Sequence, residues 1–335
     1  MASYTIPTVP VSQSPATTYD LPNFVGELFS LVPAQTPLLN MIGGLTGGKS
    51  VVTKEHVWQV EDNEAAAINN VALEGDDPTD KSIIRQEITN VVEIHQESVN
   101  ISYSKQAAVG QLGPQAAGSP FPGEPAAPIL GTQPVQSEVS HQLELKINKV
   151  ARDVERSMLN GVFQLPSDNV TERQMAGVLT AIETHTVVYA SSIRESLNGM
   201  LAGMYEDEMA VAPLINPVLF MNGTVKTWLS MEYTNNLGLA DRSRVIGGVN
   251  VETIVTDFGT FGVVLDRYMP LDEIALIDVS ALTPVFLPIP GKGHFFTEPL
   301  AKTGAYDRVQ LYGEIGLEYG PEQYHGLITG ILAPA

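Results

Sequence analysis

The chain has 335 residues, of which 44% are hydrophobic and 17% are charged, a composition typical of one large or two ordinary folded domains. It contains no cysteine, which excludes disulfide bonds and thiolate metal sites and fits a reducing compartment. The formal charge of −20 makes binding of a nucleic-acid backbone by the body of the protein unfavourable, and it excludes the basic surface typical of a sequence-reading DNA-binding protein.

Residues 1–50 predict an arm that has no core of its own. The first twenty residues are polar and interrupted by proline, without the basic start and apolar centre of a secretion signal. The apolar patch around Leu28 and Phe29 and a second patch at 37–42 contain too few side chains to form a domain. We therefore expect the arm to pack on another surface and interpret the chain as mature. No stretch is long and apolar enough for a membrane span, so we expect neither secretion nor membrane insertion.

Two β-rich segments, 51–60 and 88–103, predict the strands of one long hairpin. Both are rich in β-branched and aromatic residues and alternate in polarity. The intervening segment 61–81 is polar and contains the acidic residues Glu74, Asp76, Asp77 and Asp80. Because an isolated two-stranded hairpin is marginally stable in water, we expect this one to lie on another subunit.

A long amphipathic helix is predicted from Pro134 to Gly161, after a loop at 113–134 that is rich in proline, glycine and alanine. Its apolar residues recur every three or four positions and form a single stripe about six turns long. They are Val139, Leu143, Ile147, Val150, Val154 and Met158. Ser137 can cap the start of this helix, and Gly161 ends it.

The remainder of the chain predicts a mixed α and β region. A capping box at Ser191, Ser192 and Glu195 opens a helix that runs through Tyr205. The following elements are a buried strand at 217–221, a short helix at 223–231, strands at 249–255 and 261–265, and final strands at 309–319 and 325–332. Because these elements do not alternate as a βαβ repeat, the predicted fold class is α+β.

The segment Gly43 to Ser50, GGLTGGKS, satisfies the phosphate-loop pattern, and the segment 274–278 resembles the strand that carries a magnesium-binding acid. A phosphate loop requires a helix after its lysine and serine, because the N-terminal amides of that helix hold the phosphates. Here Ser50 precedes a strand-like segment. We therefore interpret the segment as a glycine turn between arm and hairpin, with a nucleotide-binding packaging protein as an unfavoured alternative.

No other pattern indicates catalysis or a cofactor. The histidines are scattered without metal-ligand spacing, so we expect no metal site. They are His56, His95, His141, His185, His294 and His325. No nucleophile motif is present, and we expect neither a catalytic residue nor a cofactor, hence no enzyme.

Three segments together resemble a capsid family typified by the phage SU-ten major capsid protein, within the Hong Kong 97 (HK97) type fold of tailed phages. They are DLPNFVGELFSLVPAQTPLLNMIGG near the start, VETIVTDFGTFGVVLDRYMP at 251–270, and VQLYGEIGLEYGPEQYHGLITGI at 309–331. The resemblance covers essentially the whole chain, and the order of arm, hairpin, long helix, mixed lobe and returning strands is that of the fold.

The resemblance implies five structural regions in this chain. They are an N-terminal arm at 1–50, an E-loop hairpin at 51–104, a peripheral domain at 105–184 with a spine helix at 135–160, an axial domain at 185–275, and returning peripheral strands at 276–335. Two features depart from the fold's usual pattern, since the segment 113–134 is longer than the fold needs and no long helical N-terminal extension is present. A scaffolding function is accordingly expected of a separate protein.

The resemblance implies a major capsid protein that self-assembles as hexamers and pentamers into the icosahedral head of a tailed double-stranded DNA bacteriophage. The implied location is the virion, after assembly in the host cytoplasm. The implied partners are further copies of the chain, portal, scaffold and decoration proteins, and packaged DNA bound without sequence specificity; no membrane is involved. The alternative with the same fold is an encapsulin-like nanocompartment shell.

Candidate contact residues between subunits are the large apolar and basic side chains of the arm, the hairpin and the axial lobe. They are Leu28, Phe29, Trp58, Lys81, Trp228 and Tyr233.

Overall fold

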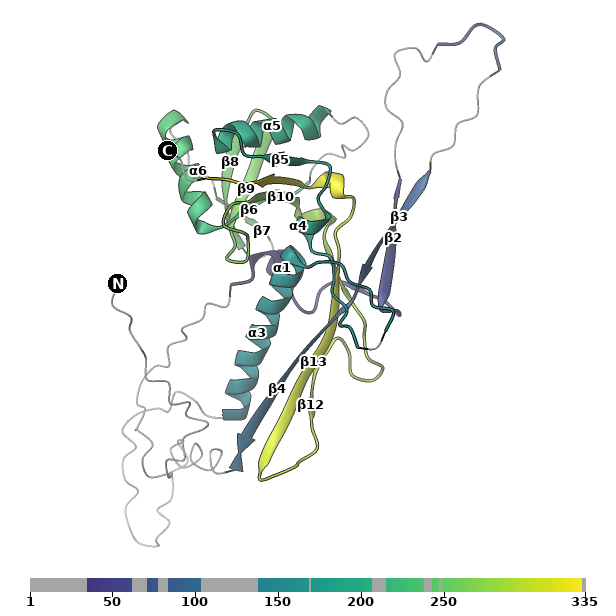
Figure 1. Cartoon of the computed structure of the whole chain (residues 1–335), viewed down its shortest axis with the longest axis vertical. Coiled ribbons are helices and arrows are strands. Elements are labelled where there is room, and N and C mark those ends of the chain that lie inside the picture. Colours follow the sequence, from purple (N-terminus) through teal and green to yellow (C-terminus); the bar gives the residue numbers. More distant parts are fainter. Residues whose placement is uncertain are drawn as a thin grey trace. The chain divides into compact units, whose positions relative to one another are not determined.

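The computed structural model describes residues 35–61, 71–77, 84–103, 138–168, 170–206, 215–237, 243–246 and 249–332. The chain divides into two compact units, which are described separately (Figure 1). The described part of the smaller unit contains 96–103, 138–150 and 296–312, and the larger unit contains the other described residues.

The smaller unit joins three strands and a helix. Strand β13 (Tyr306–Glu318) pairs with β12 (Phe295–Pro299) and with β4 (Glu93–Ser102). The long helix α3 (Glu138–Asn160) contributes its first half to this unit. Its Lys146 donates to Glu97 of β4 at 2.7 Å, and Lys149 reaches the other oxygen of the same carboxylate. Two ion pairs therefore join the helix to this sheet.

The larger unit is built on a seven-stranded mixed sheet in the order β5, β14, β10, β6, β9, β8, β7. Its strands are β5 (Thr186–Val188), β6 (Pro217–Met221), β7 (Ser243–Ile246), β8 (Val249–Thr256), β9 (Gly259–Leu265), β10 (Ile274–Asp278) and β14 (Gly326–Thr329). Every residue of β6 and β10 is buried, as expected for central strands covered on both faces. The apolar side of α5 (Ile193–Glu206) and residues of α6 (Gly223–Leu237) pack on this sheet (Figure 1).

A second group of strands in the larger unit surrounds the second half of β13. That half pairs antiparallel with β11 (Thr283–Phe286), and β11 pairs in parallel with the short β1 (Lys49–Ser50). Strands β2 (Glu55–Glu61) and β3 (Arg85–Val91) form a two-stranded sheet of their own. The remaining short elements are α1 (Pro37–Met41), α4 (Val178–Ala181) and two 3-10 helices at Val279–Ala281 and Glu322–Tyr324.

Most predicted elements are confirmed within the part of the chain that the structure describes. Helix α3 ends at Asn160, one residue before the predicted Gly161, while 134–137 and the loop at 113–134 lie outside the described residues. Helix α5 and strands β6, β8 and β9 lie where the pattern placed them, and α6 extends to Leu237, beyond the predicted end. No helix among the described residues is long and apolar enough to cross a membrane.

The prediction of one continuous strand from 88 to 103 is wrong. The segment breaks at Val92, where β3 ends its pairing with β2 and β4 begins its pairing with β13. The Val92 N–H donates to the carbonyl of Lys54 at 2.9 Å. Asn90, Val91 and Val92 are all buried, which the alternation of a single half-buried strand does not allow. The predicted long hairpin is therefore a shorter one followed by a strand of another sheet.

Candidate functional site

The base of the β2–β3 hairpin is the candidate functional site, because a projecting hairpin needs a fixed base. Side chains of β2 alternate between the chain's own interior and solvent. His56 is buried and Trp58 is half-buried on the inner face, whereas Val57 on the outer face is 50% exposed. The first half of the hairpin is thus packed on the body, and its outer face is open.

Asn90 of β3 fixes the hairpin to two other segments. Its side-chain amide nitrogen donates to the carbonyls of Leu317 at 2.7 Å and Ala176 at 3.1 Å. Its carbonyl oxygen accepts the backbone N–H groups of Ala176 and Val91, both at 2.8 Å. The residue is completely buried, and a buried amide with this many partners is both satisfied and fixed in orientation.

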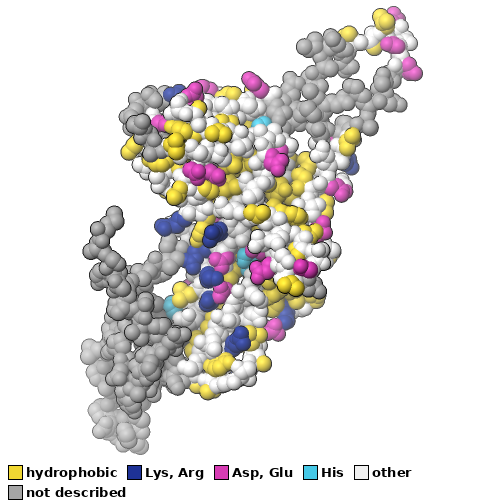
Figure 2. Space-filling model, in the orientation of Figure 1, with side chains coloured by type: hydrophobic (Ala, Val, Ile, Leu, Met, Phe, Trp, Pro, Cys, Tyr) yellow, Lys and Arg dark blue, Asp and Glu magenta, His cyan; other side chains and the backbone are white. Residues whose placement is uncertain are grey.

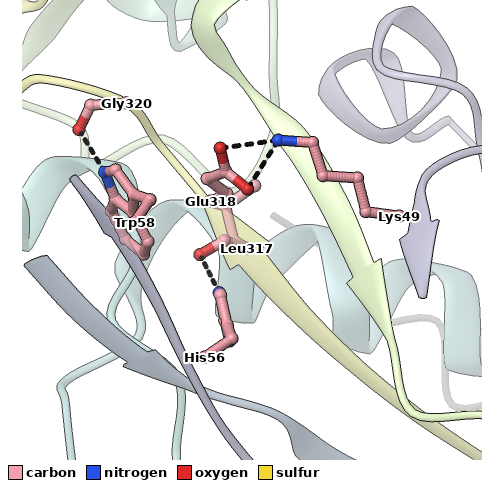
Figure 3. Close-up of polar contacts among 6 residues, drawn as sticks. All are labelled: Lys49, His56, Trp58, Leu317, Glu318 and Gly320. Atoms are coloured by element: carbon pink, nitrogen blue, oxygen red, sulfur yellow. Dashed lines mark hydrogen bonds and ion pairs between the residues drawn. The ribbon is translucent and has the colours of Figure 1, made fainter. Parts of the chain in front are cut away.

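Two ring side chains of β2 add contacts to the segment that ends β13 (Figure 3). The Nε2 atom of His56 lies 3.3 Å from the carbonyl oxygen of Leu317, and Trp58 Nε1 donates to the carbonyl of Gly320 at 3.2 Å. The Trp58 ring meets Tyr319 edge to face, with centroids 4.9 Å apart. Burial lowers the pKa of His56, so its ring is neutral at physiological pH.

A neighbouring ion pair connects β1 to the same segment. Lys49 Nζ donates to both carboxylate oxygens of Glu318, at 2.8 and 2.9 Å (Figure 3). Gly48, immediately before β1, has a φ of +150°, and a Cβ atom there would lie 2.2 Å from the carbonyl oxygen of Pro284. Glycine is required at this position by the close approach of β1 to β11.

Gly316 allows the hairpin to approach β13 closely. A Cβ atom at this position would lie 2.9 Å from the carbonyl oxygen of Val91 and 3.1 Å from His56 Cε1. Both of these atoms belong to the hairpin, so a larger residue would push the hairpin base away from β13. The base therefore depends on backbone proximity as well as on hydrogen bonds.

A buried pair of acids holds the short helix α1 on α3. Both oxygens of Glu155 accept backbone N–H groups at the start of α1, from Leu38 at 2.8 Å and Leu39 at 2.7 Å. Asp266, which follows β9, accepts the N–H of Tyr268 at 2.8 Å through Oδ1. Its Oδ2 is buried and has no hydrogen-bond partner among the described residues, and the Asp266 carboxyl interacts with that of Glu155.

The pKa of each acid reflects this environment. Burial, together with the neighbouring Asp266 carboxyl, raises the pKa of Glu155 well above its ordinary value. Burial likewise raises the pKa of Asp266. The pair thus joins α1, α3 and the turn after β9.

The family model for the SU10 major capsid protein matches residues 11–332 of this chain. The chain belongs to the SU10 major capsid protein family. It is a phage major capsid protein, and the family is a structural one. No curated protein matches the chain by sequence.

The fold is similar to that of capsid proteins whose structures are known. The capsid protein of cyanophage A-1(L) aligns with a TM-score of 0.59 and 10% identity over 95% of this chain and 98% of that one. The capsid protein of cyanophage P-SCSP1u aligns with a TM-score of 0.57 and 11% identity over 99% of this chain and 100% of that one. The SrpI encapsulin of Synechococcus elongatus aligns with a TM-score of 0.56 and 11% identity over 93% of this chain and 92% of that one. These similarities confirm the Hong Kong 97 type of fold.

The candidate contact residues occupy different environments in this major capsid protein. Trp58 contacts its own chain through Gly320 and Tyr319, and Trp228 packs on the core of the larger unit. The backbone of Tyr233 belongs to α6, but its side chain is not described. Leu28, Phe29 and Lys81 lie outside the described residues. The structure does not bring these six residues into one site, and their contacts with other subunits stay predictions.

The phosphate-loop pattern does not have the structure that nucleotide binding needs. Lys49 and Ser50 form a strand instead of opening a helix, and the lysine is paired with Glu318. Asp278, the magnesium-binding candidate, accepts the backbone N–H groups of Ile215 and Asn216 at 2.9 and 3.2 Å. Nor do the described histidines and acids form a cluster that could hold a metal ion.

Sequence analysis missed the polar residues that hold the site together. Asn90 is followed by Val91 and Val92, and all three are buried. This break in the alternation of buried and exposed side chains marks the end of the hairpin strand. Glu155 directly follows Val154 of the apolar stripe. An acid at the edge of a buried helix face indicates a polar partner inside the protein, and this was the signal available in the sequence. No local pattern connects either residue to its distant partner.

Proposed function

We propose that this major capsid protein assembles through hexamers and pentamers into the icosahedral head of a tailed phage, around double-stranded DNA. The observation that supports this most strongly is the β2–β3 hairpin. Its base is fixed by buried hydrogen bonds, whereas Val57 on its outer face and Ile84 beside β3 are 50% and 72% exposed. A two-stranded sheet with such an exposed surface is stable when another surface covers it.

In this proposal the hairpin is the E-loop, and with the N-terminal arm it lies over a neighbouring subunit. The smaller unit and the spine helix α3 belong to the peripheral domain, and the seven-stranded sheet with α5 and α6 is the axial lobe that closes the rings. Each contact is weak alone, but many repeated contacts act together in a closed shell. Assembly takes place in the host cytoplasm and involves portal, scaffold and decoration proteins.

We also propose that the protein catalyses no reaction. The potential phosphate loop has a strand where the required helix would be, and its lysine is paired with Glu318. Calorimetry with ATP and magnesium tests this point, with no saturable binding as the expected result. Binding that disappears in Lys49→Ala would contradict it.

Electron microscopy of the purified recombinant protein, with size-exclusion chromatography, tests assembly. Closed shells, rings or tubes are the expected result, and a monomer at all salt and protein concentrations, with and without a scaffold protein, would contradict the proposal. The alternative to a phage head with the same fold is a nanocompartment shell, as in SrpI encapsulin. The contents of particles from infected cells distinguish the two, since nuclease-protected DNA indicates a phage head and an enclosed enzyme indicates a compartment.

A further inference from the structure

The described tip of the hairpin, residues 71–77, carries an exposed acidic and apolar surface. The Asp76 N–H donates to the Leu73 carbonyl at 3.1 Å, and Gly75 between them has a φ of +86°, as in a type II turn. Glu74, Asp76 and Asp77 are all exposed, and no basic residue lies between 71 and 77. Val71 and Leu73 are 86% and 83% exposed beside them.

A surface of opposite charge lies in the larger unit, where α3 meets the turn after β9. Arg152 and Arg156 are one helical turn apart on the same side of α3, half-buried and exposed respectively. Arg267 is exposed in the turn, between Asp266, which interacts with Glu155, and Tyr268, whose carbonyl accepts Asn160 Nδ2 at 2.8 Å. We call Arg152, Arg156 and Arg267 the arginine patch. In Figure 2 Lys and Arg side chains gather over this part of the surface, with acidic side chains among them.

The arginine patch also has apolar neighbours. Leu265 and Leu271, on either side of the turn that carries Arg267, are 50% and 67% exposed. None of the three arginines forms an ion pair with another described residue whose side chain is placed. The patch therefore offers three positive groups for the three carboxylates of the hairpin tip. It also offers two exposed leucines for the exposed valine and leucine of the tip.

We propose that the hairpin tip of one copy binds the arginine patch of a second copy. The proposal rests on the proposed function and names the surface that receives the hairpin. A second copy is favoured over DNA as the partner for two reasons. The acidic tip of another copy supplies carboxylates for the three arginines, and exposed leucines fit the apolar residues of the tip rather than phosphate groups. Individually weak exposed ion pairs become significant when every subunit of a shell repeats them.

Charge reversal with rescue tests this contact. The patch variant Arg156→Glu with Arg267→Glu and the tip variant Asp76→Lys with Asp77→Lys should each raise the protein concentration needed for shell formation by about tenfold or more. Combining all four substitutions should restore assembly toward the wild-type concentration. Lys54→Glu is the control, because it reverses an exposed charge outside both surfaces. Circular dichroism and thermal unfolding establish that each variant is folded.

A second measurement uses the absence of cysteine from the chain. The double variant Asp76→Cys with Arg267→Cys should give covalent oligomers on a non-reducing gel after mild oxidation of assembled shells, and each single variant should not. Wild-type-like shells from both charge-reversed variants, or no cross-link in assembled double-variant shells, would overturn the proposal. Normal shells that lose their nuclease-protected DNA in the patch variant would overturn it too and assign the patch to nucleic acid. Failure of the wild-type chain to assemble contradicts the proposed function instead.

Discussion

Replacing Asn90 with alanine should release the base of the hairpin. The substitution removes four buried hydrogen bonds and leaves the N–H and C=O groups of Ala176 and the N–H of Val91 without the amide that pairs them. The Leu317 carbonyl keeps its contact with His56 Nε2 at 3.3 Å. A buried polar group without a partner costs about 1–3 kcal/mol, so three such groups with partial relaxation give an expected loss of about 3–5 kcal/mol.

Denaturant unfolding of the unassembled chain measures this loss, and hydrogen exchange locates it. Amides of β2 and β3 should exchange much faster in Asn90→Ala, while those of β6 and β10 in the central sheet should change less. Gln59→Ala is the matched control on the same hairpin, because its exposed side chain makes only a 3.4 Å contact with Glu87. A loss for Asn90→Ala within about 0.5 kcal/mol of the control would refute the reasoning.

Three further predictions concern the surrounding contacts. Gly316→Ala should destabilise the hairpin base by about 1–3 kcal/mol in denaturant unfolding, unlike Gly199→Ala on α5, whose surroundings are open; equal effects would contradict this. Because the pKa values of Glu155 and Asp266 are raised in the folded chain, the folded state holds more protons, and stability should fall as pH rises through the raised values. Asp266→Asn should weaken this fall in thermal stability above the ordinary carboxyl pKa, and an unchanged pH profile would contradict the coupling of the two acids. Lys49→Ala should cost only about 0–1 kcal/mol, because the Lys49 side chain is 58% exposed although its partner Glu318 is only 20% exposed, and a loss above about 2 kcal/mol would contradict this.

Regular elements with a strong local pattern were predictable from the sequence. The apolar stripe that includes Val150 and Val154 locates α3, because burial of one helix face leaves a periodic pattern. The continuous apolar run 217–221 locates β6, because a strand buried on both faces is apolar throughout. The strand-like residues after Ser50 argued against a phosphate loop, and in the structure Lys49 and Ser50 form a short strand rather than the start of a helix. Each of these elements depends on residues close together in the sequence, so residue propensities and the spacing of apolar residues predict it.

The contacts at the hairpin base were not predictable because they join residues far apart in the sequence. Asn90 and Leu317 are 227 positions apart, and Glu155 and Leu38 are 117 apart. A polar residue at a buried position indicates that it needs a partner but not which one. The break at Val92 was missed because both strands are rich in β-branched residues, so the change of partner leaves only a short failure of alternation.

A high-resolution electron-microscopy reconstruction of the assembled particle tests the central claim, that the hairpin is a subunit-bridging element with a fixed base. The account predicts that Asn90 still contacts Ala176 and Leu317 of its own chain, while residues 71–77 lie on the arginine patch of a neighbouring copy. A hairpin that folds back on its own subunit, or whose base detaches while the tip stays free, would contradict it.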